Sequence, residues 1–63
     1  MKKGDYIKSK YGVVRQIYEI NQYYIYFKIH DVLYRVDNDP NMWTLSSVEE
    51  YREWVKKNNS KTK

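Results

Sequence analysis

The stretch YYIYFKIHDVLYRVD, residues 23–37, decides the fold. In its first half the odd-numbered positions, from Tyr23 to Ile29, are apolar or aromatic, whereas the even-numbered positions are polar or carry a phenol. A period of two is typical of a β-strand with one face in the core. We therefore predict a strand over residues 23–30 whose odd-numbered side chains point inward.

A turn at His30-Asp31 would fold the second half of this stretch back onto the first. With a two-residue turn, all inward pairs of the hairpin become apolar or aromatic: Ile29 with Val32, Phe27 with Tyr34, and Ile25 with Val36. The agreement between the two strands is the main sequence evidence for a β-rich domain.

Working outward, runs of aromatic and β-branched residues separated by turn residues predict three further strands, at about residues 5–9, 13–20 and 42–45. Turns are expected at residues 10–12, which end in a glycine, and at residues 38–41, which contain Asn, Asp and Pro. In the second strand, strict alternation from Val14 puts Gln16 inward. A β-bulge near Arg15 or Gln16 would correct this.

A helix should follow the last strand. Ser46 and Ser47 are each followed three residues later by a glutamate, which is the pattern of a capping box. The helix is predicted to run to about Lys57, and its apolar stripe should cover one end of the sheet: Val48, Tyr51 and Val55, with Trp54 on the flank. Residues 58–63 lack apolar anchors, and we expect a disordered basic tail there.

The segments Lys3–Ile7 and Tyr11–Ile17 resemble the first hairpin of small SH3-like barrels, including Tudor and KOW-type modules. The pattern shared with those barrels is Gly-Asp-x-apolar, then a loop, then Gly-x-Val and a further apolar residue. The resemblance implies a strongly bent five-stranded barrel that binds nucleic acids, peptides or proteins and seldom catalyses reactions. The predicted fold class is therefore mainly β: a small five-stranded antiparallel SH3-like barrel with a C-terminal α-helix, forming one domain over residues 1–57.

Composition sets limits on partners. The chain has 63 residues, no cysteine and a net charge of +4, so it has room for one core and no disulfide to reinforce it. The charge is segregated: residues 1–36 carry seven basic and three acidic residues, residues 37–54 one basic and five acidic, and residues 55–63 four lysines. Because no apolar run is long enough to span a membrane and the start lacks a signal-peptide core, we expect a cytoplasmic protein without a membrane partner.

No set of catalytic residues is visible. A single histidine, His30, and no cysteine leave no ligand spacing for a metal. Asp37 and Asp39 are best explained as turn formers. We therefore expect no enzymatic activity, no metal and no cofactor.

One surface has the composition of a binding site: the outer face of the third and fourth strands, with its tyrosines and basic residues. Its candidate residues are Tyr24, Tyr26, Lys28 and Arg35, extended by Arg15. Exposed tyrosines beside Arg and Lys suit base stacking and phosphate pairing, and they also suit protein hot spots. In the predicted register Tyr26 faces Arg35, close enough for a cation-π contact. Alternatively, Tyr24 and Tyr26 pack beneath the C-terminal helix.

Two functions remain open. The first is a stand-alone, non-catalytic binding module that recognises nucleic acid or a nucleic-acid-handling protein. The second is a phage or mobile-element protein that inhibits or adapts a host protein, because the acidic residues 37–53 would repel phosphates and match a basic protein surface. The richness in Lys, Asn, Ile and Tyr suits an AT-rich genome of that kind.

Overall fold

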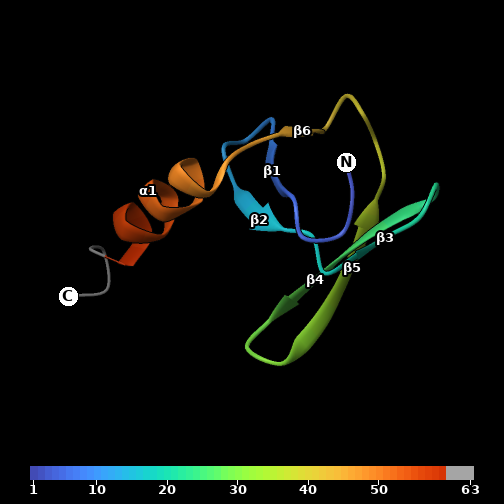
Figure 1. The fold of residues 1–63 in the computed structure, drawn as a ribbon, viewed down its shortest axis with the longest axis horizontal. Coiled ribbons are helices and arrows are strands. Elements are labelled where there is room, and N and C mark those ends of the chain that lie inside the picture. Colours follow the sequence, from blue (N-terminus) through green and yellow to red (C-terminus); the bar gives the residue numbers. More distant parts are fainter. Residues whose placement is uncertain (60–63) are drawn as a thin grey trace.

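The computed structural model describes residues 1–59, within which the chain forms two small antiparallel sheets and one helix (Figure 1). The first sheet has the strand order β2-β1-β6 and the second β3-β4-β5. The elements are β1 (Tyr6–Ser9), β2 (Val14–Gln16), β3 (Glu19–Ile20), β4 (Tyr24–Ile29), β5 (Val32–Asp37), β6 (Trp43–Leu45) and α1 (Val48–Asn59). The mainly β class with a C-terminal helix is confirmed. The five-stranded barrel is not confirmed: the six strands of residues 1–59 form two three-stranded sheets that do not close into a barrel.

The hairpin of β4 and β5 has the predicted register. Ile29 lies opposite Val32 and Phe27 opposite Tyr34 across a two-residue turn. Both turn residues have positive φ, 51° at His30 and 63° at Asp31. Two residues of positive φ give the turn a twist that matches the right-handed twist of the strands, which is why this turn closes a tight hairpin.

The predicted second strand, residues 13–20, is two strands in two different sheets. Up to Ile17 the chain pairs with the N-terminal segment: Gly4 N donates to Ile17 O (2.9 Å), and Ile17 N donates to Asp5 O (2.8 Å). One residue later the pairing changes, and Tyr18 N donates to Tyr26 O of β4 (2.8 Å). The predicted bulge at Arg15 or Gln16 is therefore wrong. The irregular apolar pattern that suggested it arises because the chain crosses between sheets.

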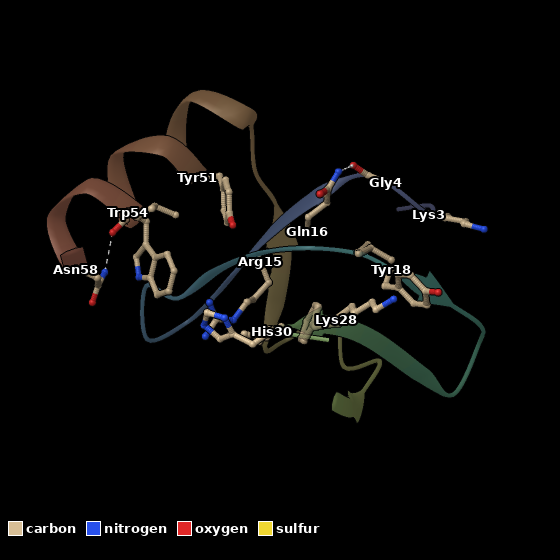
Figure 2. A pocket seen from close by; sticks show the side chains of 14 residues that line it. Lys3, Gly4, Arg15, Gln16, Tyr18, Lys28, His30, Tyr51, Trp54 and Asn58 are labelled. Atoms are coloured by element: carbon tan, nitrogen blue, oxygen red, sulfur yellow. Dashed lines mark hydrogen bonds between the residues drawn. The ribbon is translucent and has the colours of Figure 1, made fainter. Parts of the chain in front are cut away.

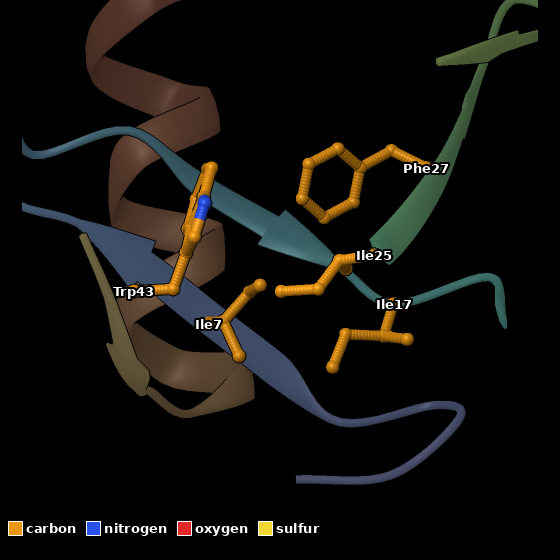
Figure 3. Packing of buried hydrophobic residues seen from close by; sticks show 5 residues of the cluster. All are labelled: Ile7, Ile17, Ile25, Phe27 and Trp43. Atoms are coloured by element: carbon orange, nitrogen blue, oxygen red, sulfur yellow. The ribbon is translucent and has the colours of Figure 1, made fainter. Parts of the chain in front are cut away.

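The core lies between the two sheets and consists of five buried side chains (Figure 3): Ile7, Ile17, Ile25, Phe27 and Trp43. The rings of Phe27 and Trp43 have centroids 5.3 Å apart and an interplanar angle of 59°. Aromatic pairs with tilted rings at this distance are favourable beyond the area that they bury. Because Phe27 is on β4 and Trp43 on β6, this contact joins the sheets to each other.

The helix begins as the capping pattern predicts. Ser47 is the N-cap, since its hydroxyl accepts from Glu50 N (3.2 Å). The Glu50 carboxylate accepts from the Ser46 hydroxyl and from Lys8 Nζ (2.5 Å), which fastens the first helical turn to β1. The Tyr51 ring lies 5.1 Å from the ring of Tyr6, also on β1.

The helix packs against β2, an outer strand of the first sheet (Figure 1). It runs two residues beyond the predicted end at Lys57, and the Asn58 side chain donates to Trp54 O (2.7 Å). This bond satisfies one carbonyl of the last turn. The remainder of the predicted tail, residues 60–63, lies outside the described residues.

We expect Phe27→Ala to unfold the domain. Removing a buried phenylalanine costs about 3 to 5 kcal/mol, and the whole stability of a chain this size is about 3 to 9 kcal/mol. Thermal unfolding followed by circular dichroism measures the loss. Tyr11→Ala is the matched control, because Tyr11 is 75% exposed and its removal should change the melting temperature little. Equal melting temperatures for the two variants would contradict the assigned core.

The contact between β1 and α1 should make stability depend on pH. The ammonium of Lys8, together with the Ser46 hydroxyl, lowers the pKa of the Glu50 carboxyl below its usual value of 4.5. A carboxyl with a lowered folded-state pKa stabilises the fold above its unfolded pKa, and this contribution is lost as the pH falls through the folded value. The melting temperature of the wild type should therefore fall on acidification below pH 4.5 more steeply than that of Glu50→Gln.

The matched control for this pH dependence is Glu49→Gln. Glu49 is the exposed neighbour of Glu50 in the first helical turn, and its substitution changes the net charge equally without touching the Lys8 ion pair. Its pH profile should follow the wild type. Identical profiles for Glu50→Gln and Glu49→Gln would show that the Lys8 contact contributes nothing.

Candidate nucleic-acid interface

A cleft of about 790 Å³ lies between α1, β2 and the end of β4 (Figure 2). The cleft forms because the chain crosses from the first sheet to the second after Ile17. The ladder between β3 and β4 ends at the pair Glu19 and Tyr26, while β2 has turned away to pair with β1. The last three residues of β4, Phe27 to Ile29, therefore border a gap where a closed barrel would have continued the sheet. The helix forms the opposite wall with Tyr51 and Trp54.

Two cations inside this cleft lie over aromatic rings. The Arg15 guanidinium carbon is 4.6 Å from the centroid of the Trp54 ring, and Lys28 Nζ is 5.3 Å from the centroid of Tyr18. Figure 2 shows these side chains around the cleft, with Trp54 on α1 at one end and with Lys28 of β4 beside Tyr18 at the other. A cation over a ring face is held there by the ring quadrupole, so both charges have a preferred position.

The cleft has a uniform charge. Lys3, Arg15 and Lys28 supply its formal charges, His30 lies beside them at the hairpin turn, and no carboxylate is among the 14 lining residues. Lys3 forms an ion pair with Glu19, which is not a lining residue: the Glu19 carboxylate is 3.7 Å from Lys3 Nζ and well exposed. A concave surface lined by one sign of charge focuses its field and attracts counter-ions. We call this cleft, defined by Lys3, Arg15, Tyr18, Lys28 and Trp54, the cationic cleft.

The structure divides the predicted site residues into two groups. Arg15 and Lys28 line the cationic cleft, whereas Tyr24, Tyr26 and Arg35 lie together on the second sheet. The rings of Tyr24 and Tyr26 are 6.5 Å apart and meet edge to face. We call these last three residues the tyrosine face.

Arg35 makes a cation-π contact, but with Tyr24 and not with Tyr26 as expected. Tyr26 and Arg35 are opposite each other in the ladder as predicted, but the Arg35 guanidinium lies 4.4 Å from the centroid of Tyr24, which is diagonal to it. Diagonal neighbours are within reach of long side chains. The alternative in which Tyr24 and Tyr26 pack beneath the helix is also wrong, because α1 packs against β2.

Sequence reasoning missed the aromatic half of the cleft. The sequence pattern puts Trp54 on the flank of the apolar stripe of the helix. A residue in that position can line a cleft beside the packed face, so this pattern could have identified it. Tyr18 carried no such signal, because its surroundings depend on the sheet change one residue earlier. His30 was expected to be a solvated turn residue and is exposed.

Comparisons with protein-family models, with curated proteins and with solved structures give no significant match. Within residues 1–59, no group of three or more His, Cys, Asp or Glu side chains is placed to hold a metal ion. The helix in this range is too short and too polar to cross a membrane.

Proposed function

We propose that this chain is a non-catalytic binding module for single-stranded nucleic acid, which it holds in the cationic cleft. The observation that carries the proposal is the pairing of Arg15 with Trp54 and of Lys28 with Tyr18 in a cleft without a carboxylate. Cations for phosphates and ring faces for bases are the two components that single-stranded nucleic-acid sites combine.

Each residue has a distinct role in this proposal. Arg15 and Lys28 pair with phosphates, and their ring contacts reduce the side-chain entropy that would be lost on binding. The guanidinium of Arg15 has five N–H donors, so an arginine resting on a ring still presents donors to a phosphate. Trp54 and Tyr18 supply ring faces for bases; Tyr18 is 46% exposed.

A single strand fits this composition better than a duplex. Bases in a duplex are stacked on one another, so their faces are not accessible to Trp54 or Tyr18, whereas bases of a single strand can stack on aromatic side chains. The tyrosine face offers a continuation of the site, because Lys28 shares the outer side of β4 with Tyr24 and Tyr26. The likeness of the first hairpin to small barrels that bind nucleic acids or proteins also supports a binding role.

We expect single-stranded oligonucleotides to bind with a strong salt dependence. Arg15→Gln and Lys28→Gln should each remove one phosphate contact and lower the slope of log affinity against log salt by about 0.7. Trp54→Ala should weaken binding by about 1 to 3 kcal/mol through lost stacking and leave the slope nearly unchanged. Fluorescence anisotropy of labelled oligonucleotides, titrated at about 50 mM and 200 mM salt, distinguishes the two effects.

Arg52→Gln is the matched control for charge. Arg52 is exposed on α1 and does not line the cleft, so the substitution lowers the net charge equally without removing a contact. Its slope should stay close to the wild-type value. If no oligonucleotide binds even at the lower salt, the proposed function is wrong.

A protein partner is the second candidate. The observation that favours it is the exposure of adjacent large apolar side chains on β5, with Val32 at 50% and Leu33 at 56%. Neighbouring exposed apolar residues are typical of protein contact surfaces. An inhibitor or adaptor of a host protein would use such residues, and failure of the oligonucleotide titration would place this candidate first.

A further inference from the structure

The outer edge of β5 is the longest unpaired strand edge within residues 1–59. Strand β5 has six residues and pairs only with β4. The other edge strands, β2, β3 and β6, have two or three residues each. In Figure 1 the hairpin of β4 and β5 projects away from the first sheet, so this edge is open to solvent.

This edge has few of the features that usually prevent strands from pairing. Strand β5 contains no proline and no lysine, its register with β4 is unbroken over all six residues, and its two charged residues, Arg35 and Asp37, lie in its second half. Three successive large apolar residues are about half exposed: Val32 at 50%, Leu33 at 56% and Tyr34 at 49%. A long edge with apolar side chains on both faces favours association with another strand.

The free backbone groups of the edge are identified by the hairpin register. Ile29 and Val32 flank a two-residue turn and therefore form a hydrogen-bonded pair, after which bonded and non-bonded pairs alternate. Leu33 and Arg35 occupy the non-bonded positions of the pairing with β4. Their N–H and C=O groups consequently point away from β4, where a further strand can pair with them.

A second copy of this chain is the partner that fits the edge. Two identical strands pair antiparallel about a two-fold axis, which gives a closed and self-complementary interface. An axis normal to the sheet keeps each side chain on its own face. Each residue therefore lies opposite the same residue of the second copy, or opposite one that is an even number of positions away. One residue lies on the axis, and its identity defines the pairing.

Repulsion between like charges disfavours two of these pairings. With Arg35 on the axis, two guanidinium groups would oppose each other. With Tyr34 on the axis, the turn residue Asp31 would lie beside Asp37 of the second copy. Like charges directly opposite one another destabilise a ladder.

The pairing centred on Leu33 satisfies both charge and burial. It brings the turn residue Asp31, directly before β5, beside Arg35 of the second copy at each end, so that opposite charges meet. The other two exposed apolar residues, Val32 and Tyr34, oppose each other, and the two Leu33 side chains meet on the axis. A pairing centred on Val36 also brings opposite charges together, but it leaves Val32 and Leu33 outside the ladder.

We propose that two copies of this chain pair through β5, antiparallel about a two-fold axis at Leu33, and join their second sheets into one continuous six-stranded sheet. The pairing is independent of nucleic acid. The pairing edge itself, β5, contributes no residue to the lining of the cationic cleft.

Sedimentation velocity without nucleic acid tests the association. As the concentration of the wild type rises, its sedimentation coefficient should increase to that of a dimer, with twice the 7.8 kDa mass of the chain. Leu33→Lys places two ammonium groups on the axis and should remain at the monomer mass. Because Leu33 is exposed, this variant should keep the wild-type circular dichroism spectrum. A wild type that stays monomeric at millimolar concentration, or a folded Leu33→Lys that still dimerises, would overturn the proposal.

Single cysteines test the register, since the chain has none of its own. Residues opposite each other in a hydrogen-bonded pair have Cα atoms about 5.5 Å apart, within the range of about 4.4 to 6.8 Å that a disulfide spans. Leu33→Cys should therefore form a covalent dimer under mild oxidation. Tyr34→Cys and Arg35→Cys should do so no faster than Tyr11→Cys, whose exposed side chain measures random collision. Fastest cross-linking at residue 34 or 35 would refute the pairing.

Discussion

The contact between Phe27 and Trp43 is the constraint on which the rest of the structure depends. Each sheet has only three short strands and cannot bury an apolar face alone. The two rings come from different sheets and meet at the centre of the core, with Ile7, Ile17 and Ile25 around them. The chain has no disulfide and, within residues 1–59, no metal cluster to reinforce this contact. Packing between the sheets is therefore the main source of stability.

The open cleft follows from how the chain reaches this packing. Ile17 is buried and bonded to the N-terminal segment, and Tyr18 is already bonded to β4. One peptide unit thus connects the two sheets, and it separates β2 from the end of β4. The gap left between them is lined by residues of β2, the end of β4 and α1. The fold and the proposed binding site consequently have a common origin in this crossing.

The parts of the fold that could be predicted are those set by local pattern. The hairpin register follows from strict alternation over residues 23–37, and the helix start follows from the serine and glutamate spacing. The sheet change at Ile17 could not be predicted, because a strand that changes partners shows the same residue types as a bulged strand. The cationic cleft was predicted only in part, because its aromatic residues also depend on the sheet change. Arg15 and Lys28 were identified as cations, but their ring partners depend on tertiary packing.

The two tryptophans lie in different surroundings, and this gives the molecule two separate optical signals. Trp43 is buried in the core, whereas Trp54 is half-buried at the cleft beneath the Arg15 guanidinium. The emission of Trp43 depends on whether the sheets are packed together. The emission of Trp54 depends on what occupies the cleft and on the position of the cation above the indole. Replacing Trp54 with phenylalanine would leave a chain whose tryptophan fluorescence reports the packing of the two sheets without a signal from the cleft.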